Sequence, residues 1–275
     1  MSSKTFFVDI EANVITLPDS RWYETRYGTF PSATTVLNMV AKPGLEAWKT
    51  KLAMDGIDPK TVGRQAMDEG SEVHTLCENW MKGATPSFFS DEGEKQYKLH
   101  EEWIPFCRFM ESYKELEIAP ILIEQELVNG AVGYAGTLDM LCILTPKKEK
   151  PRLALVDLKR AKAPMPSYYW QVASYVKAIQ WLYNNELDFR EYLQGFDIND
   201  DQMNGLSGYL LLLNVETKKG WRLTEVKDIK HSYKNFLACY RLFKDGKKSF
   251  EYAKEEYLLT APSVNGEELT NEDEL

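Results

Sequence analysis

The first half of the chain repeats apolar residues at helical spacing. From Pro31 to Met54 the pattern predicts short helices, with Ser32 and Thr34 as capping residues. From Thr61 to Lys82 apolar side chains return every three or four residues, which predicts a longer helix. A third helix is predicted from about Asp91 to Glu117, where aromatic and Met side chains form the buried stripe.

The period then changes to that of β-strands. Ile121 to Val128 is predicted as a strand, and Asn129-Gly130 is typical of a hairpin turn. A second strand is expected from roughly Ala131 to Leu144, and the apolar segment Leu153 to Lys159 predicts a third, central strand. Four further elements are predicted: a helix over Tyr168 to Tyr183, a buried strand over Gly208 to Val215, an edge strand over Trp221 to Val226 and a closing helix over Lys230 to Lys244.

This order of elements predicts an α/β fold, with a central mixed β-sheet flanked by helices and a helical N-terminal portion. We expect a single domain over residues 1–264, made of a helical part (30–118), a catalytic core (119–226) and closing helices (228–258). An acidic C-terminal tail (265–275) follows; from Glu267 to Leu275 it carries five acidic residues and no base.

Composition narrows the class of protein. A hydrophobic fraction of 44% and seven Trp indicate a globular chain. No apolar run of about 18 residues predicts a membrane span, and the first residues lack the pattern of a secretory signal. Four widely spaced Cys favour free thiols in a reducing cytoplasm over disulfides or a zinc site. The net charge of -9 is unfavourable for binding phosphates, but basic residues gather between Lys147 and Lys162.

The predicted third strand carries the candidate chemistry. Asp157 and Lys159 are two residues apart, so both side chains lie on one face of the sheet, while Val156 and Leu158 point into the core. Asp139 lies near the end of the second strand, and pairing of the two strands would bring it beside Asp157. Two neighbouring carboxylates repel unless a cation lies between them, and such oxygen ligands favour Mg²⁺ or Mn²⁺. The Lys ammonium would stabilise charge on a phosphate.

Each candidate also has an ordinary structural interpretation. Acid-x-Lys is a common triplet that, on spacing alone, indicates a solvated ion pair. Gln171 and Tyr175 lie one turn apart on a helix face, where a core Tyr with an exposed Gln is the alternative. His74 is a metal ligand, a phosphate partner or a structural residue. Glu124 and Glu126 share one strand face, and the pattern does not separate them.

Five motifs follow one another along the chain: Gly70-x-x-x-His74, a strand Glu, Gly136-x-x-Asp139, Asp157-x-Lys159 and Gln171-x-x-x-Tyr175. In this order and spacing they resemble the RecB-like branch of the PD-(D/E)xK nuclease superfamily, and within it the group of the mitochondrial genome maintenance exonuclease and its phage relatives. The segment FPSATTVLNMV, followed by LEAWKTKLA, is similar to an N-terminal stretch of that group. The resemblance extends from about Phe30 to Val215 and implies a restriction-endonuclease-like core.

The resemblance also implies a metal site. Asp139 and Asp157 would bind Mg²⁺ or Mn²⁺, helped by the Leu158 carbonyl and by His74. The matching strand glutamate is Glu124 by its distance from Asp139, with Glu126 as the fallback.

Further residues would act on the substrate. The resemblance implies that Lys159 assists the attacking water and that Gln171 with Tyr175 positions Lys159 and the DNA strand. Arg160 stands where the family often has Thr or Ser, and together with Lys162 it is expected to bind substrate through a backbone phosphate. The iron–sulfur members of this branch use a C-terminal Cys cluster. Only one Cys occurs in this part of the chain, so we predict no iron–sulfur cluster.

The implied function is a metal-dependent DNA exonuclease of a bacterial or phage-infected cytoplasm, acting on single-stranded DNA or DNA ends in replication, recombination or repair. A protein partner from replication or recombination stays open. The alternatives are a double-strand-processing or structure-selective nuclease, a catalytically inactive DNA-binding protein and an enzyme for small phosphate esters. Five aromatic residues would stack on bases or belong to the core: Trp48, Trp80, Tyr168, Tyr169 and Trp170.

Overall fold

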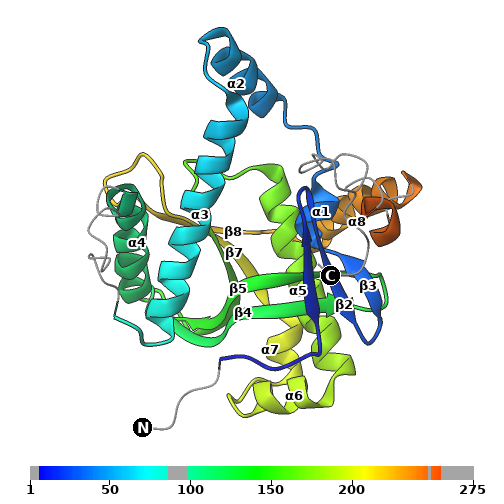
Figure 1. The fold of residues 1–275 in the computed structure, drawn as a ribbon. Helices are drawn as coiled ribbons and strands as arrows, with labels where there is room; N and C mark the ends of the chain where they lie inside the picture. The colour runs from blue at the N-terminus through cyan, green and yellow to red at the C-terminus, as the bar shows by residue number, and fades with distance from the viewer. Residues whose placement is uncertain (1–5, 86–97, 247–248, 255–275) are drawn as a thin grey trace.

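The computed structural model describes residues 6–85, 98–246 and 249–254. Its centre is a five-stranded sheet in the order β4-β5-β6-β7-β8 (Figure 1). The strands are β4 (Ala119–Asn129), β5 (Tyr134–Leu144), β6 (Arg152–Lys159), β7 (Ser207–Leu212) and β8 (Arg222–Glu225). Strands β6 and β7 pair in parallel and the other neighbours pair antiparallel. The predicted mixed sheet and its three leading strands are therefore confirmed.

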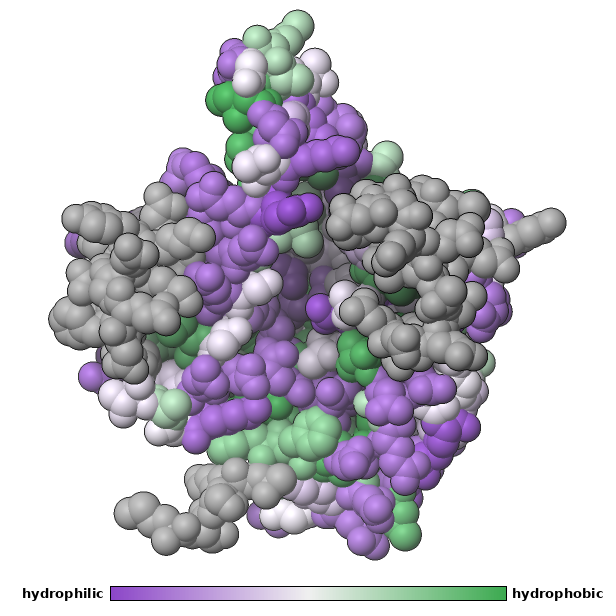
Figure 2. Space-filling view, in the orientation of Figure 1, coloured by the Kyte–Doolittle hydropathy of each residue, from purple (hydrophilic) through white to green (hydrophobic). Residues whose placement is uncertain are grey.

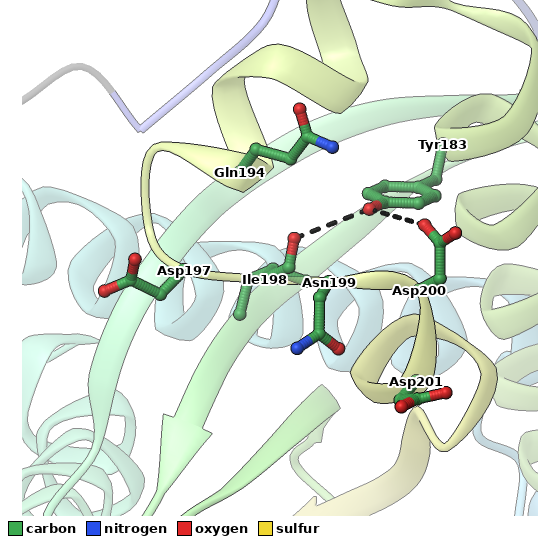
Figure 3. Close-up of a pocket in the computed structure, with 7 residues that line it drawn as sticks. All are labelled: Tyr183, Gln194, Asp197, Ile198, Asn199, Asp200 and Asp201. Atoms are coloured by element: carbon green, nitrogen blue, oxygen red, sulfur yellow. Dashed lines mark hydrogen bonds between the residues drawn. The ribbon is translucent and has the colours of Figure 1, made fainter.

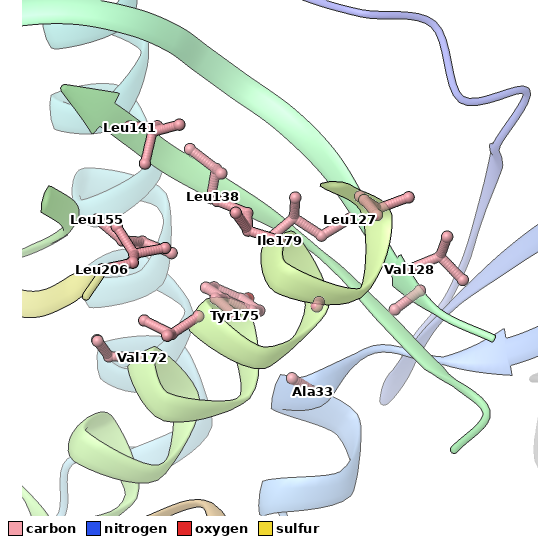
Figure 4. Close-up of a cluster of buried hydrophobic side chains, with 14 of the residues drawn as sticks. Ala33, Leu127, Val128, Leu138, Leu141, Leu155, Val172, Tyr175, Ile179 and Leu206 are labelled. Carbon is pink, nitrogen blue, oxygen red and sulfur yellow. The ribbon is translucent and has the colours of Figure 1, made fainter. Parts of the chain in front are cut away.

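Helices cover both faces of this sheet. Strand β6 alternates strictly, because Leu155 packs in a core with α5 (Pro166–Asn185), whereas Val156 packs in a second core with α3 (Pro59–Met81). Figure 4 shows the first core, where one face of α5 meets side chains of the sheet. Two more helices complete the layers: α8 (Ile229–Asp245) packs on α5, and α4 (Lys98–Glu115) packs on α3. The α/β class follows from these two buried layers.

The chain before the helical part forms an unpredicted antiparallel sheet. Its strands are β1 (Asn13–Leu17), β2 (Ser20–Thr25) and β3 (Gly28–Pro31), and they precede α1 (Ala33–Leu37) and α2 (Pro43–Met54). Two short helices, α6 (Leu187–Gln194) and α7 (Asp200–Asn204), were also unpredicted. Ser32 caps α1 as expected, because its hydroxyl accepts from Thr35 N–H. Residues 91–97 of the third predicted helix lie outside the described residues.

The hairpin between β4 and β5 corrects the prediction of a two-residue turn. Asn129 pairs with Tyr134, so four residues form the loop and β5 begins later than expected. The Asn129 side chain accepts from Val132 N–H, and Gly133, not Gly130, takes the left-handed conformation with φ 95°. At the other end of the chain, residues 250–254 are helical after α8, while the predicted closing segment beyond 254 and the acidic tail lie outside the described residues.

Helix α2 and the first half of α3 project from the body (Figure 1). Helix α2 buries none of its residues, and the buried residues of α3 are Val73, Cys77 and Met81, all in its second half. Figure 2 shows hydrophilic residues continuing from this projection down the face of α3, beside a recess. Within the described residues, no helix combines the length and apolarity needed to cross a lipid bilayer.

Candidate metal centre

Strands β5 and β6 stop pairing regularly at the position of Asp139. Their ladder ends at the pair Met140–Val156, and one step further along both strands Asp139 stands opposite Asp157. The Asp139 Oδ2 atom accepts a hydrogen bond of 2.5 Å from the Leu158 N–H. A side-chain carboxylate therefore binds an amide that a regular ladder would pair with a backbone carbonyl. The predicted metal bond of the Leu158 carbonyl stays a prediction.

Glu124 lies across from Asp139 on the neighbouring strand β4. Ile123 pairs with Met140 and Gln125 pairs with Leu138, which sets Glu124 across from Asp139. Its backbone is left-handed, with φ 49°. Such a conformation costs roughly 1–3 kcal/mol for a residue other than Gly, and it concentrates at functional sites. This strained residue in the middle of β4 points to a site at Glu124.

His74 completes a group of three residues that could hold a metal ion. It lies on α3, and its Nδ1 is 3.2 Å from Asp139 Oδ1. One ligand atom each from His74, Glu124 and Asp139 lies within 4.8 Å of the other two. An imidazole with two carboxylates suits a divalent cation. Glu126 is not in this group of described residues, so the structure brings Glu124, of the two glutamates left open, to the site.

The electrostatics of this group show two crowded acids. Burial and the negative charge of Asp139 raise the pKa of Glu124 to about 8, against the opposing effect of His74. Burial also opposes ionisation of Asp139, but His74, Lys159 and the Leu158 N–H outweigh it and lower the pKa of Asp139. For His74, burial disfavours the imidazolium, yet the Asp139 carboxylate outweighs burial and raises the pKa. The site thus holds more acidic than basic groups, which a cation would balance.

Asp157 and Lys159 form a buried ion pair beside the three candidate ligands. Asp157 is 1% exposed, and its Oδ2 lies 2.7 Å from the Lys159 ammonium. Burial raises the pKa of Asp157 to about 6, Lys159 opposes this shift and Asp139 adds to it. Burial alone would lower the pKa of Lys159, but the charges of Asp157 and Asp139 outweigh it and raise that pKa. The solvated ion pair considered from spacing is therefore wrong, and Lys159 stays an ammonium.

Gln171 and Tyr175 support this pair from α5. The Gln171 Nε2 donates to Asp157 Oδ1 at 3.2 Å and to the Tyr175 hydroxyl at 3.1 Å, so both amide protons are used. A Cβ added at Gly136 would lie 2.6 Å from the Tyr175 ring, so the missing side chain makes room for that ring. Gln171 and Tyr175 are both buried, which rules out an exposed Gln; their contact with DNA stays a prediction.

The two basic residues after Lys159 have acidic partners. Arg160 lies 2.6 Å from Glu69 of α3, and Lys162 lies 2.6 Å from Glu216. Their binding of phosphate stays a prediction. Sequence analysis missed Glu69, although an acidic residue one turn before Val73, in line with the buried stripe of α3, was a signal that could have found it.

The aromatic residues differ in their surroundings. Trp80 packs edge-on against Phe109 and Tyr113, so it belongs to the core rather than to a stacking surface. Tyr168 contributes to the site, because the Lys159 ammonium lies 5.4 Å from the centre of its ring. Trp48 is partly exposed on α2, while Tyr169 and Trp170 are half-buried against the α5 core.

A separate pocket of about 710 Å³ lies where α5 ends and α6 and α7 follow (Figure 3). It is lined by Tyr183, Gln194, Asp197, Ile198, Asn199, Asp200 and Asp201. The Tyr183 hydroxyl donates to the Ile198 carbonyl and to Asp200. This lining holds three acids and no basic residue, and it shares no residue with the group around Asp139. The pocket is therefore not part of the candidate metal centre.

The site is built from segments far apart in the sequence: one turn of α3, facing positions of β4 and β5, the end of β6 and the start of α5. No model of a known protein family matches the chain, and a search among curated proteins found no match.

Proposed function

We propose that this chain is a divalent-metal-dependent nuclease that hydrolyses DNA phosphodiesters, acting on single strands or on DNA ends. One observation carries the proposal: an imidazole and two carboxylates lie within 4.8 Å of one another, beside a buried ion pair that includes a Lys ammonium. Phosphodiester hydrolysis needs an activated water and positive charge around the phosphate. With a cation bound, this set of groups would supply both.

His74, Glu124 and Asp139 would hold the cation. Asp157 is a further candidate because it stands opposite Asp139 and its Oδ2, although close to the Lys159 ammonium, has no hydrogen-bond partner among the described residues. When bound, the cation supplies Lewis-acid charge and favours ionisation of water. Glu124, with a pKa of about 8, would give up its proton as the metal binds.

The chain's own residues would supply the remaining functions. Lys159 keeps its proton because two carboxylates raise its pKa, so it suits stabilisation of negative charge on the phosphate rather than the role of a base. Asp157 holds the ammonium in place, and the Gln171 amide holds Asp157. Tyr175 accepts the second amide proton, which fixes the orientation of Gln171. This chain of contacts would hold the ammonium in position.

The test is cleavage of labelled single-stranded, blunt and flapped DNA with Mg²⁺, with Mn²⁺ or with EDTA. We expect cleavage with either metal and none with EDTA, and the preferred substrate identifies the subtype. Lys159→Ala should abolish cleavage, whereas Lys177→Ala, which removes a half-buried Lys of α5 bonded to Gln180, should not. Cleavage that persists in EDTA, or wild-type turnover by Lys159→Ala, would reject the proposal.

A further inference from the structure

Glu69 and Arg160 form an ion pair that joins α3 to the end of β6. The Arg160 guanidinium lies 2.6 Å from the Glu69 carboxylate, and the two side chains are only 20% and 16% exposed. Arg160 directly follows Lys159, and Glu69 precedes His74 by five residues on the same helix. The pair therefore connects the two elements that carry the ammonium and the imidazole of the candidate metal centre.

Glu69 occupies a place where the buried stripe of α3 would continue. Val73, Cys77 and Met81 are spaced by four residues and are buried, and Glu69 lies four residues before Val73. No residue of α3 before Val73 is buried. The ion pair thus holds the helix just before its buried stripe, next to the part that projects with α2 (Figure 1).

A partly buried ion pair is a costly way to attach a helix. Removing both charges from water offsets much of their attraction, and an apolar pair of similar size is often as stable or more so. The planar guanidinium, however, binds a carboxylate in one direction, which fixes position more narrowly than apolar contact does. The Arg160 Nε is also buried without a hydrogen-bond partner, so stability alone does not account for this arrangement.

We infer that Arg160 and Glu69 are positioning residues that fix α3 against the end of β6 and so hold His74 at Asp139. The distance from Glu69 to His74 along the helix axis is roughly 7.5 Å, short enough for a rigid helix to transmit the placement. The inference rests on the proposed metal centre. It does not require that the substrate be DNA.

The test measures binding of Mn²⁺ alone, by paramagnetic resonance, and amide hydrogen exchange of α3 in the metal-free protein. Arg160→Gln and Glu69→Gln should each weaken Mn²⁺ binding by roughly 10-fold or more, as removal of residues that orient metal ligands does. Exchange of residues 59–72 should become faster in both. The reversed pair, Glu69→Arg with Arg160→Glu, should recover most of the affinity for Mn²⁺. DNA cleavage by each of the two single variants should recover at saturating Mn²⁺.

Glu216→Gln is the matched control, because it breaks an ion pair of the same 2.6 Å length after β6 whose side chains are exposed. It should change neither measurement. If Arg160→Gln does not fold, Arg160→Lys takes its place.

Unchanged Mn²⁺ affinity in both single variants overturns the inference, as does a reversed pair that binds no better than they do. Loss of DNA affinity by Arg160→Gln with normal Mn²⁺ binding would instead make Arg160 a phosphate contact. A wild-type protein that binds no Mn²⁺ rejects the metal centre itself. Wild-type binding of Mn²⁺ without cleavage of DNA rejects the nuclease function and leaves the positioning pair standing.

Discussion

Replacing Glu124 by Gln tests whether this residue is a crowded metal ligand. In the metal-free protein Glu124 lies beside the Asp139 carboxylate, and burial together with that charge raises the pKa of Glu124 from 4.5 to about 8. The folded state therefore holds a proton that the unfolded state releases. The stability contributed by neutral Glu124 is full below pH 4.5 and is lost as pH rises through about 8.

The magnitude follows from this shift. At ~1.4 kcal/mol per pKa unit, full ionisation would cost at most about 5 kcal/mol. Because Glu124 is only half-buried, solvent reduces this cost to roughly 2 kcal/mol. For a chain of this size each kcal/mol moves the melting temperature by roughly 2–4 °C. We expect metal-free Glu124→Gln to melt about 5 °C above the wild type at pH 8.5 and close to it at pH 5.

Calorimetric melting with and without Mg²⁺ is the assay. Mg²⁺ should raise the melting temperature of the wild type more at pH 8.5 than at pH 5, because protons compete for the ligands. Glu124→Gln should lose most of this response. Glu126→Gln, two residues along the same strand and outside the ligand group, should keep it. A full Mg²⁺ response in Glu124→Gln, or no stabilisation of its metal-free form at pH 8.5, would refute the reasoning.

Three further outcomes follow from the site. Asp157→Ala should abolish cleavage of labelled DNA while circular dichroism shows a folded protein, since Asp157 faces the ammonium rather than the core; cleavage at the wild-type rate would contradict this. Tyr175→Phe keeps the ring but removes the acceptor of one Gln171 proton, so turnover should fall less than in Asp157→Ala, and an unchanged rate would reduce Tyr175 to packing. Gly136→Ala overpacks the Tyr175 ring and should lower the free energy of unfolding in denaturant by ~1–3 kcal/mol. Gly70→Ala, where a Cβ would meet open space on a helix, should raise it by up to ~1 kcal/mol. Equal stability of the two variants would contradict the packing argument.

The sequence predicted best those elements in which apolar residues repeat at a regular spacing. Strand β6 alternates between two cores, so Asp157 and Lys159 were correctly expected on one face and Val156 with Leu158 on the other. The small N-terminal sheet was missed because its first strand is mostly exposed and shows no apolar alternation. Trp22 and Tyr23 of β2 are buried, but two adjacent aromatic residues do not define a period.

At the candidate site the pattern of apolar and polar residues predicted the strand pairing but not the details of the backbone. Strand pairing correctly set Asp139 opposite Asp157, but it did not predict that the ladder ends there and that Asp139 binds the Leu158 amide. The Leu158 N–H binds a carboxylate where a regular ladder would give it a carbonyl, and the spacing of apolar residues does not predict this local exchange. Nor does periodicity encode the left-handed backbone of Glu124. Both departures adjoin Asp139, where candidate ligands from α3 and β4 meet it and where Asp157 pairs with the ammonium.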